Sequence, residues 1–159
     1  MKDYITKIRK KIGRDSFIHP AARIVIENAE REILLIKRTD NGQFGLVAGA
    51  FEEGETIEDC IRREVLEETG LRIIDLEVIG ISSNPMTEKV VYSNGDQIQY
   101  FTVEFYSNTW EKTTRPFDAE EVISVGFYDK SFIEKLPNNE RSTFESLDYF
   151  RKSGKILVK

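Results

Sequence analysis

Residues 49–71 of this chain read GAFEEGETIEDCIRREVLEETGL. A glycine-punctuated loop comes first, and a segment with helical character follows it. Thr56 and Asp59 have the spacing of a capping box, and Gly70 is a natural stop for a helix. The pattern therefore predicts a loop that leads into a helix over about residues 57–69.

Three glutamates share one side of this predicted helix. An α-helix turns about 100° per residue, so Glu67 and Glu68 lie within about 60° of Glu64. Ile61 and Val65 belong to the adjoining apolar stripe, which puts the carboxylates at the border of the buried face. Three carboxylates within ~6 Å repel one another by several kcal/mol in total, so the cluster needs protons or a cation. Oxygen ligands favour hard ions, and we expect Mg²⁺, with Mn²⁺ as a substitute.

The negative charge of the chain is concentrated in this stretch. The whole sequence has 23 basic and 28 acidic residues, a net charge of −5. Residues 52–68 contain eight of the acidic and two of the basic residues, so the remainder carries a net charge of +1. A local acidic excess attracts divalent cations, whereas the balance elsewhere does not favour general nucleic-acid binding.

The spacing of these residues resembles the signature of the Nudix hydrolases, G-x5-E-x7-R-E-U-x-E-E-x-G-U, in which U is apolar. Every fixed position is filled, by Gly49, Glu55, Arg63, Glu64, Val65, Glu67, Glu68, Gly70 and Leu71. Seven of these positions demand one residue type, so a chance match is on the order of 10⁻⁷ per starting position. A solvated acidic helix face, the alternative explanation of the glutamates, does not account for the loop residues.

The resemblance implies both a fold and an activity. The fold would be α/β, a Nudix-type α/β/α sandwich with a mixed sheet, in a single domain over residues 1–159. The activity would be Mg²⁺-dependent hydrolysis of a pyrophosphate bond, by a metal-activated water, in a nucleoside diphosphate linked to another group, such as a nucleoside triphosphate or nucleotide sugar. One alternative is an RNA 5′-end pyrophosphohydrolase, for which the basic segment 7–14 is the support. Another is a Nudix-fold module that senses a nucleotide without turnover, although such modules often lack the signature glutamates that this chain has.

The resemblance also implies roles for residues within the signature. Glu64, Glu67 and Glu68 would bind the metal with the carbonyl of Gly49, and Glu67 and Glu68 would be catalytic. Four further residues would have a mainly structural part, in which an ion pair ties the loop to the helix and two glycines shape the backbone: Glu55, Arg63, Gly54 and Gly70.

Residues before the signature are candidates for substrate binding. Arg38 ends a predicted strand at a position that often contacts substrate phosphate in related enzymes, and Phe44 stands where relatives usually have tryptophan. The run from Phe44 to Gly49 reads F-G-L-V-A-G in place of a W-G-L-P-G-G-like sequence, so Val47 and Ala48 replace a proline and a glycine.

A further glutamate is expected downstream, because Nudix enzymes commonly recruit one as metal ligand or general base. Glu120 and Glu121 precede a predicted strand over 122–128. Strand side chains alternate between faces, and Glu121 has the parity of Ile123 and Val125, the apolar and hence inner face. We therefore favour Glu121 over Glu120 for the metal-binding and catalytic role. The alternatives are a signature glutamate that acts alone, with Glu120 and Glu121 both solvated loop acids.

The remaining elements follow from hydrophobic periodicity and turn residues. His19-Pro20 predicts a loop, and a Ser93–Asp96 turn is expected to join the third and fourth strands. The expected elements are an amphipathic helix over 3–12, strands over 21–27, 32–38, 71–83, 97–107 and 122–128, helical turns near 131–136 and a last helix over about 139–152.

The whole chain sets outer limits on function. Cys60 is the single cysteine, so an intrachain disulfide is excluded. The first residues lack the apolar core of a signal peptide, and no apolar run approaches the ~20 residues that cross a membrane. We therefore expect a cytoplasmic protein with a small nucleotide substrate and with no membrane or nucleic-acid partner; a homodimer stays open.

Overall fold

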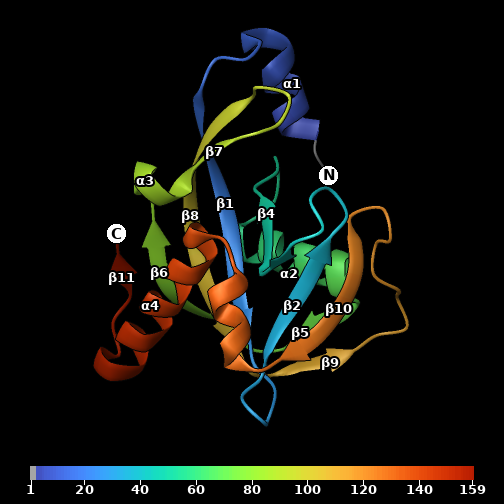
Figure 1. Cartoon of the computed structure of the whole chain (residues 1–159), viewed down its shortest axis with the longest axis vertical. Coiled ribbons are helices and arrows are strands. Elements are labelled where there is room, and N and C mark those ends of the chain that lie inside the picture. Colours follow the sequence, from blue (N-terminus) through green and yellow to red (C-terminus); the bar gives the residue numbers. More distant parts are fainter. Residues whose placement is uncertain (1–2) are drawn as a thin grey trace.

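The structure, a computed structural model, describes residues 3–159 (Figure 1). Its elements in chain order are α1 (Asp3–Ile12), β1 (Phe17–Ile26), β2 (Ile33–Arg38), β3 (Phe44–Gly45), β4 (Val47–Ala50), α2 (Ile57–Thr69), β5 (Leu71–Ile73), β6 (Glu77–Ser82), α3 (Pro85–Glu88), β7 (Lys89–Val91), β8 (Gln97–Ser107), β9 (Trp110–Lys112), β10 (Val122–Tyr128), the 3-10 helix η1 (Lys130–Lys135), α4 (Asn138–Ser153) and β11 (Leu157–Val158). None of the helices in this described part is long and apolar enough to span a membrane.

The strands form mixed sheets. The largest has the order β11-β6-β8-β1-β4, with β7 also paired to β8. Strands β1 and β8 run parallel from Phe17↔Ile98 to Ile26↔Ser107. Strand β4 is antiparallel to β1, and β6 is antiparallel to β8 but parallel to β11. A three-stranded sheet has the order β10-β2-β3, and β5 pairs with β9.

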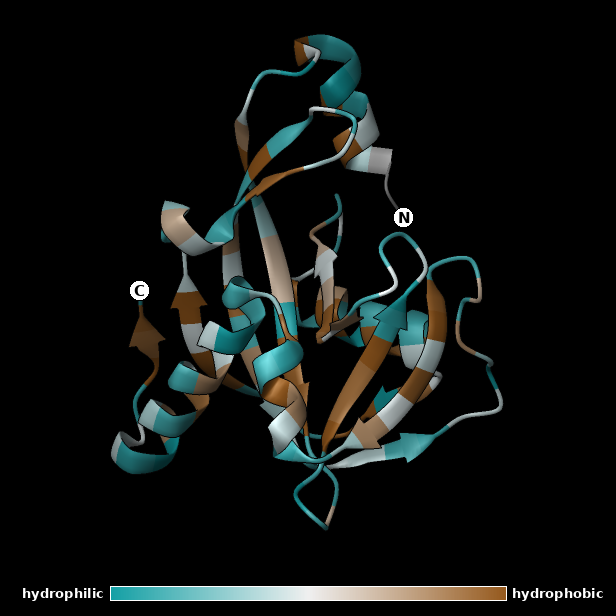
Figure 2. Ribbon diagram, in the orientation of Figure 1, coloured by the Kyte–Doolittle hydropathy of each residue, from teal (hydrophilic) through white to brown (hydrophobic). Residues whose placement is uncertain are grey.

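Two apolar cores lie on opposite faces of the central strands. The alternation of side chains along β2 divides Leu34 and Ile36 from Ile33 and Leu35. The first pair packs with α2 in one core, and the second pair packs in the other core with Leu147 of α4. Helices therefore cover both faces, as Figure 1 shows, and the central strands β1 and β2 are largely apolar in Figure 2. The predicted α/β fold with a mixed sheet and helices on both faces is confirmed.

The expected long strand over 71–83 is wrong. The segment contains two strands in different sheets, since β5 pairs with β9 and β6 pairs with β8. Between them, the backbone N–H groups of Ile74 and Asp75 donate to Thr109. The backbone changes its pairing partner at this break, and a hydrophobic pattern does not report such a change.

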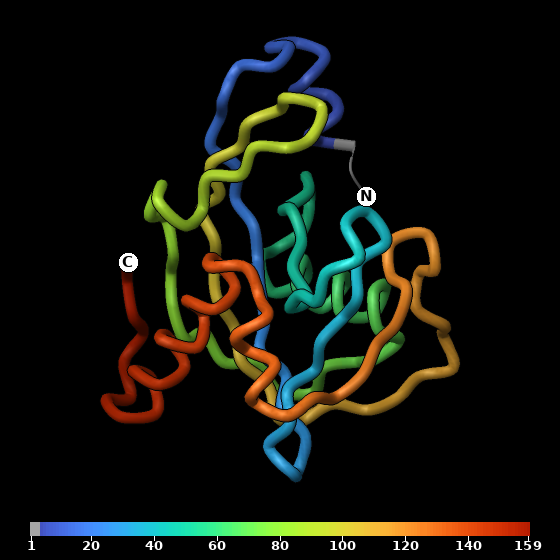
Figure 3. The backbone as a smooth tube through the Cα atoms, viewed as in Figure 1, coloured from blue at the N-terminus to red at the C-terminus, as the bar shows by residue number. Residues whose placement is uncertain are grey.

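The Ser93–Asp96 turn joins β7, not the preceding long strand, to β8. Helix α3 and strand β7 were not predicted, although Asn84-Pro85 is a start signal for a helix: the Asn84 side chain accepts from Met86 N, and Pro85 occupies the first turn. The trace in Figure 3 shows the β7–β8 hairpin beside α1 at one end of the molecule. There, Arg9 Nη2 donates to Gln97 O at 2.8 Å.

His19 lies within β1 and not in the expected loop, because β1 begins at Phe17. The imidazole is buried against the rings of Tyr4, Phe17 and Tyr100. Burial lowers its pKa, against a hydrogen bond with the Phe51 backbone. These surroundings indicate a structural role for this histidine.

Candidate active site

Helix α2 has both predicted ends. Thr56 Oγ1 accepts from Asp59 N at 3.1 Å, and Asp59 Oδ2 accepts from Thr56 N at 3.3 Å, which completes the capping box. Gly70 ends the helix in the left-handed region, with φ of 73°, and its N–H donates to Leu66 O. A Cβ at Gly70 would lie 2.4 Å from Arg115 O, so both conformation and space require glycine.

The carboxylates of α2 lie deeper than the expected border position. Glu64 and Glu68 are 5% and 4% exposed, close to the fully buried Ile61 and Val65, whereas Glu67 is half-buried. Burying a carboxylate is costly unless it is paired. The helix therefore carries two charged groups into the protein, and their partners decide what the site can do.

Strand β4, which precedes α2, passes directly over Glu64. A Cβ on Gly49 would lie 2.1 Å from Glu64 Cδ, so only glycine lets the backbone run so close to this carboxylate. Gly49 belongs to β4, which pairs with β1 through Ala22↔Gly49. The sheet thus holds the backbone of Gly49 against Glu64, which is the proximity that a shared metal site would need.

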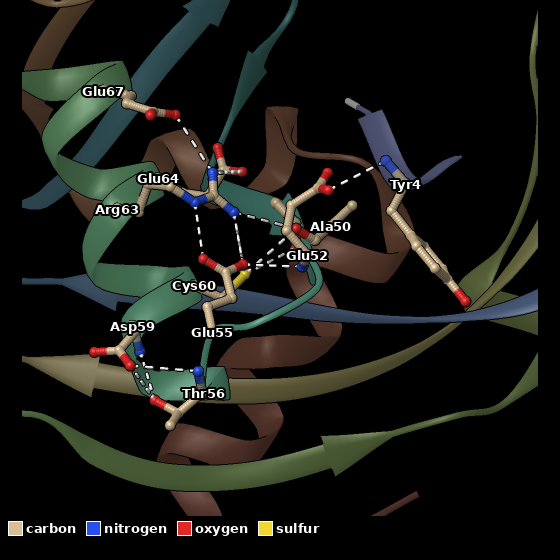
Figure 4. Close-up of polar contacts among 11 residues, drawn as sticks. Tyr4, Ala50, Glu52, Glu55, Thr56, Asp59, Cys60, Arg63, Glu64 and Glu67 are labelled. Carbon is tan, nitrogen blue, oxygen red and sulfur yellow. Dashed lines mark hydrogen bonds and ion pairs between the residues drawn. The ribbon is translucent and has the colours of Figure 1, made fainter. Parts of the chain in front are cut away.

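Arg63 ties the loop to the helix, as Figure 4 shows. Its Nε and Nη2 donate to the two oxygens of Glu55 at 3.0 and 2.9 Å, the pairing expected for the signature. Its Nη1 also donates to Glu64 Oε1 at 2.7 Å and to Glu67 Oε2 at 3.4 Å. The hydrogen bond from Arg63 lowers the pKa of Glu55. Gly54, one residue before Glu55, has φ of 86° in the same loop.

Glu68 is the least compensated carboxylate of the cluster. Its Oε2 is buried and has no hydrogen-bond partner in the described part of the chain. Desolvation raises its pKa to about 8; Arg38 opposes this shift, and Glu64, Glu121 and Glu140 add to it. Desolvation likewise raises the pKa of Glu64, against its bond with Arg63. Buried, mutually repelling carboxylates of this kind are stabilised by a cation.

The residues fit a hard divalent cation by ligand type, because carboxylate oxygens are the ligands that Mg²⁺ prefers. Within residues 3–159, no three His, Cys, Asp or Glu side chains are gathered closely enough to form a ready-made metal centre. Arg63 bonds to both Glu64 and Glu67, so these two would share their oxygens between Arg63 and an ion. Glu68 Oε2, by contrast, has no competing hydrogen bond in this part of the chain.

Glu121 lies at the cluster, but not for the expected reason. A bulge between Val122 and Ser124 breaks the alternation of β10. Val122 is 1% exposed, and Ile123, expected on the inner face, is 52% exposed. The charge of Glu121 nevertheless raises the pKa of both Glu64 and Glu68, whereas Glu120 is exposed.

Arg38 lies beside the cluster. Its Nη2 donates to Leu46 O at 3.0 Å and to Glu140 Oε1 at 3.3 Å. Burial works against its charge, but the carboxylates of Glu140 and then Glu68 outweigh this effect and raise the pKa of Arg38. A cationic donor is thus held next to the acidic cluster.

Phe44 packs in an aromatic group away from the carboxylates. Its ring lies 5.1 Å from that of Tyr128 and 5.6 Å from that of Phe132, both edge-on. Lys37, its cross-strand partner on β2, has its Nζ 5.9 Å from the centre of the Phe44 ring. Phe44 is half-buried in this group, on the core that contains α4.

Glu140 is the residue of this region that sequence reasoning missed. It is 6% exposed and accepts hydrogen bonds from Arg38 and from Leu46 N. An acidic residue in the first turn of a helix normally indicates only a favourable interaction with the helix dipole. No local signal therefore distinguished Glu140 from a surface residue.

Comparisons with known proteins agree with the signature. The family model of the NUDIX domain matches residues 17–149. The ADP-ribose pyrophosphatase of Methanocaldococcus jannaschii is 42% identical over 92 residues, which cover 53% of this chain and 54% of that protein. The NAD-capped RNA hydrolase NudC of Vibrio parahaemolyticus is 44% identical over 59 residues, 36% of this chain and 23% of that protein. The chain spans about half the length of the first of these relatives and less of the second.

The fold also has close counterparts. The MutT NUDIX hydrolase of Burkholderia pseudomallei has a TM-score of 0.63 to this chain at 19% identity, and the likeness covers 82% of this chain and 98% of that one. Identity this low is evidence of the shared fold alone. The match of the family model covers most of the sequence and includes the whole glycine- and glutamate-containing signature. The chain therefore belongs to the Nudix family.

Proposed function

We propose that this protein hydrolyses a pyrophosphate bond in a nucleoside diphosphate linked to another group. The observation that carries the proposal is the buried Glu68 carboxylate beside Glu64 and Glu121, one oxygen of which accepts no hydrogen bond from the described residues 3–159. A purely structural acid would be expected to have its hydrogen-bond partners. An unpaired one at the centre of an acidic cluster supports a site that completes itself with a cation and an anionic substrate.

Glu64, Glu67 and Glu68 would hold the cation, with the carbonyl of Gly49 and with Glu121. When bound, a divalent ion such as Mg²⁺ or Mn²⁺ neutralises charge on a diphosphate and lowers the pKa of a coordinated water. Glu121 then serves as ligand or as proton acceptor. Arg63 sets the orientation of Glu64 and Glu67 through its bonds to both.

ADP-ribose is the first substrate that we propose, because a relative named ADP-ribose pyrophosphatase is 42% identical over 92 residues. The products would be AMP and ribose 5-phosphate, since water adds across the P–O–P bond. Arg38 would bind a substrate phosphate, for which a guanidinium has suitably arranged donors. Phe44, in β3, would contribute to substrate binding.

A substrate panel tests this function directly. Purified protein with Mg²⁺ would be given ADP-ribose, nucleotide sugars, nucleoside triphosphates and dinucleoside polyphosphates, and products would be separated by ion-exchange chromatography. We expect turnover that requires Mg²⁺ and falls by orders of magnitude in Glu67→Gln and Glu68→Gln. Glu58→Gln is the matched control, because Glu58 is exposed on the same helix. Turnover that survives Glu68→Gln at limiting Mg²⁺ would contradict the assignment, and no turnover of any substrate would favour a sensing module.

A second candidate is hydrolysis at the 5′ end of RNA, which the position of α1 favours. Tyr4 N donates to Glu52 Oε2 at 3.2 Å, and Lys7 Nζ lies 3.6 Å from Glu53 Oε2, so α1 is tied to the signature loop. Its exposed Lys10 and Lys11 would add positive charge to the helix that contacts the signature loop.

The RNA candidate predicts a charge effect that is specific for long substrates. Lys10→Glu/Lys11→Glu should slow turnover of a 5′-triphosphorylated oligoribonucleotide but leave ADP-ribose turnover unchanged. The control for net charge is Lys152→Glu combined with Lys155→Glu, at exposed positions near the C-terminal end of α4, because it changes the charge by the same amount. Equal rates for the double variant and this control on RNA would remove the candidate.

A further inference from the structure

Helix α4 reaches the candidate active site through one buried side chain. Glu140, in its first turn, accepts from Leu46 N at 2.6 Å with Oε2 and from Arg38 Nη2 at 3.3 Å with Oε1. Leu46 O accepts from the same Nη2 at 3.0 Å. Glu140, Arg38 and the Leu46 peptide therefore form a closed set of contacts between α4, the end of β2 and the link between β3 and β4.

Close packing at Gly45 shows how tightly this set is confined. A Cβ on Gly45 would lie 2.8 Å from Arg38 Nε and 3.0 Å from Glu140 Oε2. The absence of a side chain at Gly45 therefore makes room for the guanidinium and the carboxylate together. Any group added there would push the end of the Arg38 side chain away.

The anchor of Glu140 is rigid because α4 is itself fixed by buried polar contacts. Arg23 Nε donates to Thr143 Oγ1 at 2.8 Å, and Thr143 Oγ1 donates to Glu104 Oε1 at 3.0 Å. Arg23 also pairs with Glu104 and Glu88 at 3.0 and 2.8 Å. Thr143 lies one turn after Glu140, so this network fixes the helix turn from which Glu140 projects.

Arg38 is electrostatically coupled to Glu68 as well as to Glu140, and each of these carboxylates raises the pKa of Arg38. Within residues 3–159, the side-chain hydrogen bonds of Arg38 use Nη2 alone. Nε and Nη1 are thereby left as donors for an anion at the edge of the acidic cluster.

We propose that Glu140 is a positioning residue that holds the Arg38 guanidinium in place to receive a substrate phosphate. The inference rests on the proposed function of the site, and it adds a residue outside the signature and 102 positions from Arg38. Glu140 acts through Arg38 and does not itself touch the substrate. Its carboxylate fixes one end of the guanidinium, so that less conformational freedom is lost when phosphate binds.

The test measures binding of methylenediphosphonate, a diphosphate analogue that cannot be hydrolysed, by calorimetry in Mg²⁺. Glu140→Gln keeps an oxygen for Leu46 N–H and removes the charge that orients Arg38. We expect it to weaken binding about fivefold to tenfold, the scale of the net contribution of one typical hydrogen bond, and to raise KM for the substrate more than it lowers kcat. Glu145→Gln, an exposed site on the same helix, is the matched control and should change neither.

A double-mutant cycle separates positioning from a structural role. Arg38→Gln should weaken binding by itself, and adding Glu140→Gln to it should have no further effect, because the two residues act as one unit. Gly45→Ala provides a second route, since it displaces Arg38 without removing a charge, and it should weaken binding similarly even if Glu140→Gln fails to fold.

Several outcomes would overturn the proposal. The first is that Glu140→Gln weakens binding as much in the Arg38→Gln variant as in the unaltered protein. The others are that Glu140→Gln leaves binding unchanged or makes it tighter, that Gly45→Ala leaves binding unchanged, or that the unaltered protein does not bind methylenediphosphonate. A protein that binds methylenediphosphonate with this coupling but hydrolyses nothing would refute the proposed function and leave the role of Glu140 intact.

Discussion

The buried Glu68 carboxylate should make the metal-free protein less stable than a variant that lacks the charge. Desolvation raises the pKa of Glu68 from 4.5 to about 8. Above pH 4.5 this group ionises in the unfolded chain but stays protonated in the folded protein until about pH 8. The folded state therefore binds more protons, and stability falls as the pH rises through this window.

The magnitude follows from about 1.4 kcal/mol per pH unit. At pH 7 the lost stability is about 3 kcal/mol, and at pH 5 it is about 1 kcal/mol or less. Glutamine has nearly the same shape as glutamate but does not titrate. Both side chains bury a polar atom at this position, so the difference in stability between them reports mainly the charge. Glu68→Gln should thus gain stability at pH 7 while it loses turnover.

Urea denaturation with EDTA at pH 5 and pH 7 measures this difference, with Glu58→Gln as an exposed control on the same helix. We expect Glu68→Gln to be more stable than the unaltered protein by a margin that shrinks at pH 5. A variant less stable at pH 7, or a margin that is the same at both pH values, would refute the reasoning.

Three further predictions follow from the site and its helix. Mg²⁺ should raise the melting temperature by binding the native state, and the rise should shrink in Glu64→Gln; a melting temperature unaffected by tens of millimolar Mg²⁺ would count against the site. Glu121→Gln should lower kcat at least about tenfold, or about 1.4 kcal/mol of transition-state stabilisation, while Glu120→Gln changes it little; equal small effects would disprove the assignment. Gly70→Ala should cost more than about 1 kcal/mol of stability by urea denaturation, because of the positive φ and the contact with Arg115 O, and a neutral result would show that the helix end relaxes.

Elements with signals in adjacent residues were predicted well. Helix α2 spans Ile57–Thr69 as expected, because its capping box and its final glycine act over three or four residues. Strands β8 and β10 also have the expected bounds. The ion pair between Glu55 and Arg63 could also be predicted from the sequence, since the loop and the helix are consecutive in the chain.

The position of Glu121 shows where local rules stop. Alternation of side chains predicts faces only while the strand is regular, and the bulge between Val122 and Ser124 reverses the assignment for Ile123. Pairing with β2 creates this bulge, so the residues of 122–128 do not reveal it. The division of the expected strand over 71–83 between two sheets likewise follows from pairing with strands distant in sequence, β9 and β8.

The sequence by itself determined the family, the fold class, the glutamate-bearing helix and the glycine that must pass over Glu64, since each depends on neighbouring residues with a fixed spacing. Tertiary structure alone decided how far Glu64 and Glu68 are buried, that Arg63 is shared by Glu64 and Glu67, and that Glu140 meets Arg38. Desolvation and ion pairing are set by what surrounds a charge in space. These properties therefore depend on which elements pack around each carboxylate and exclude water, and on charged partners that are distant in sequence.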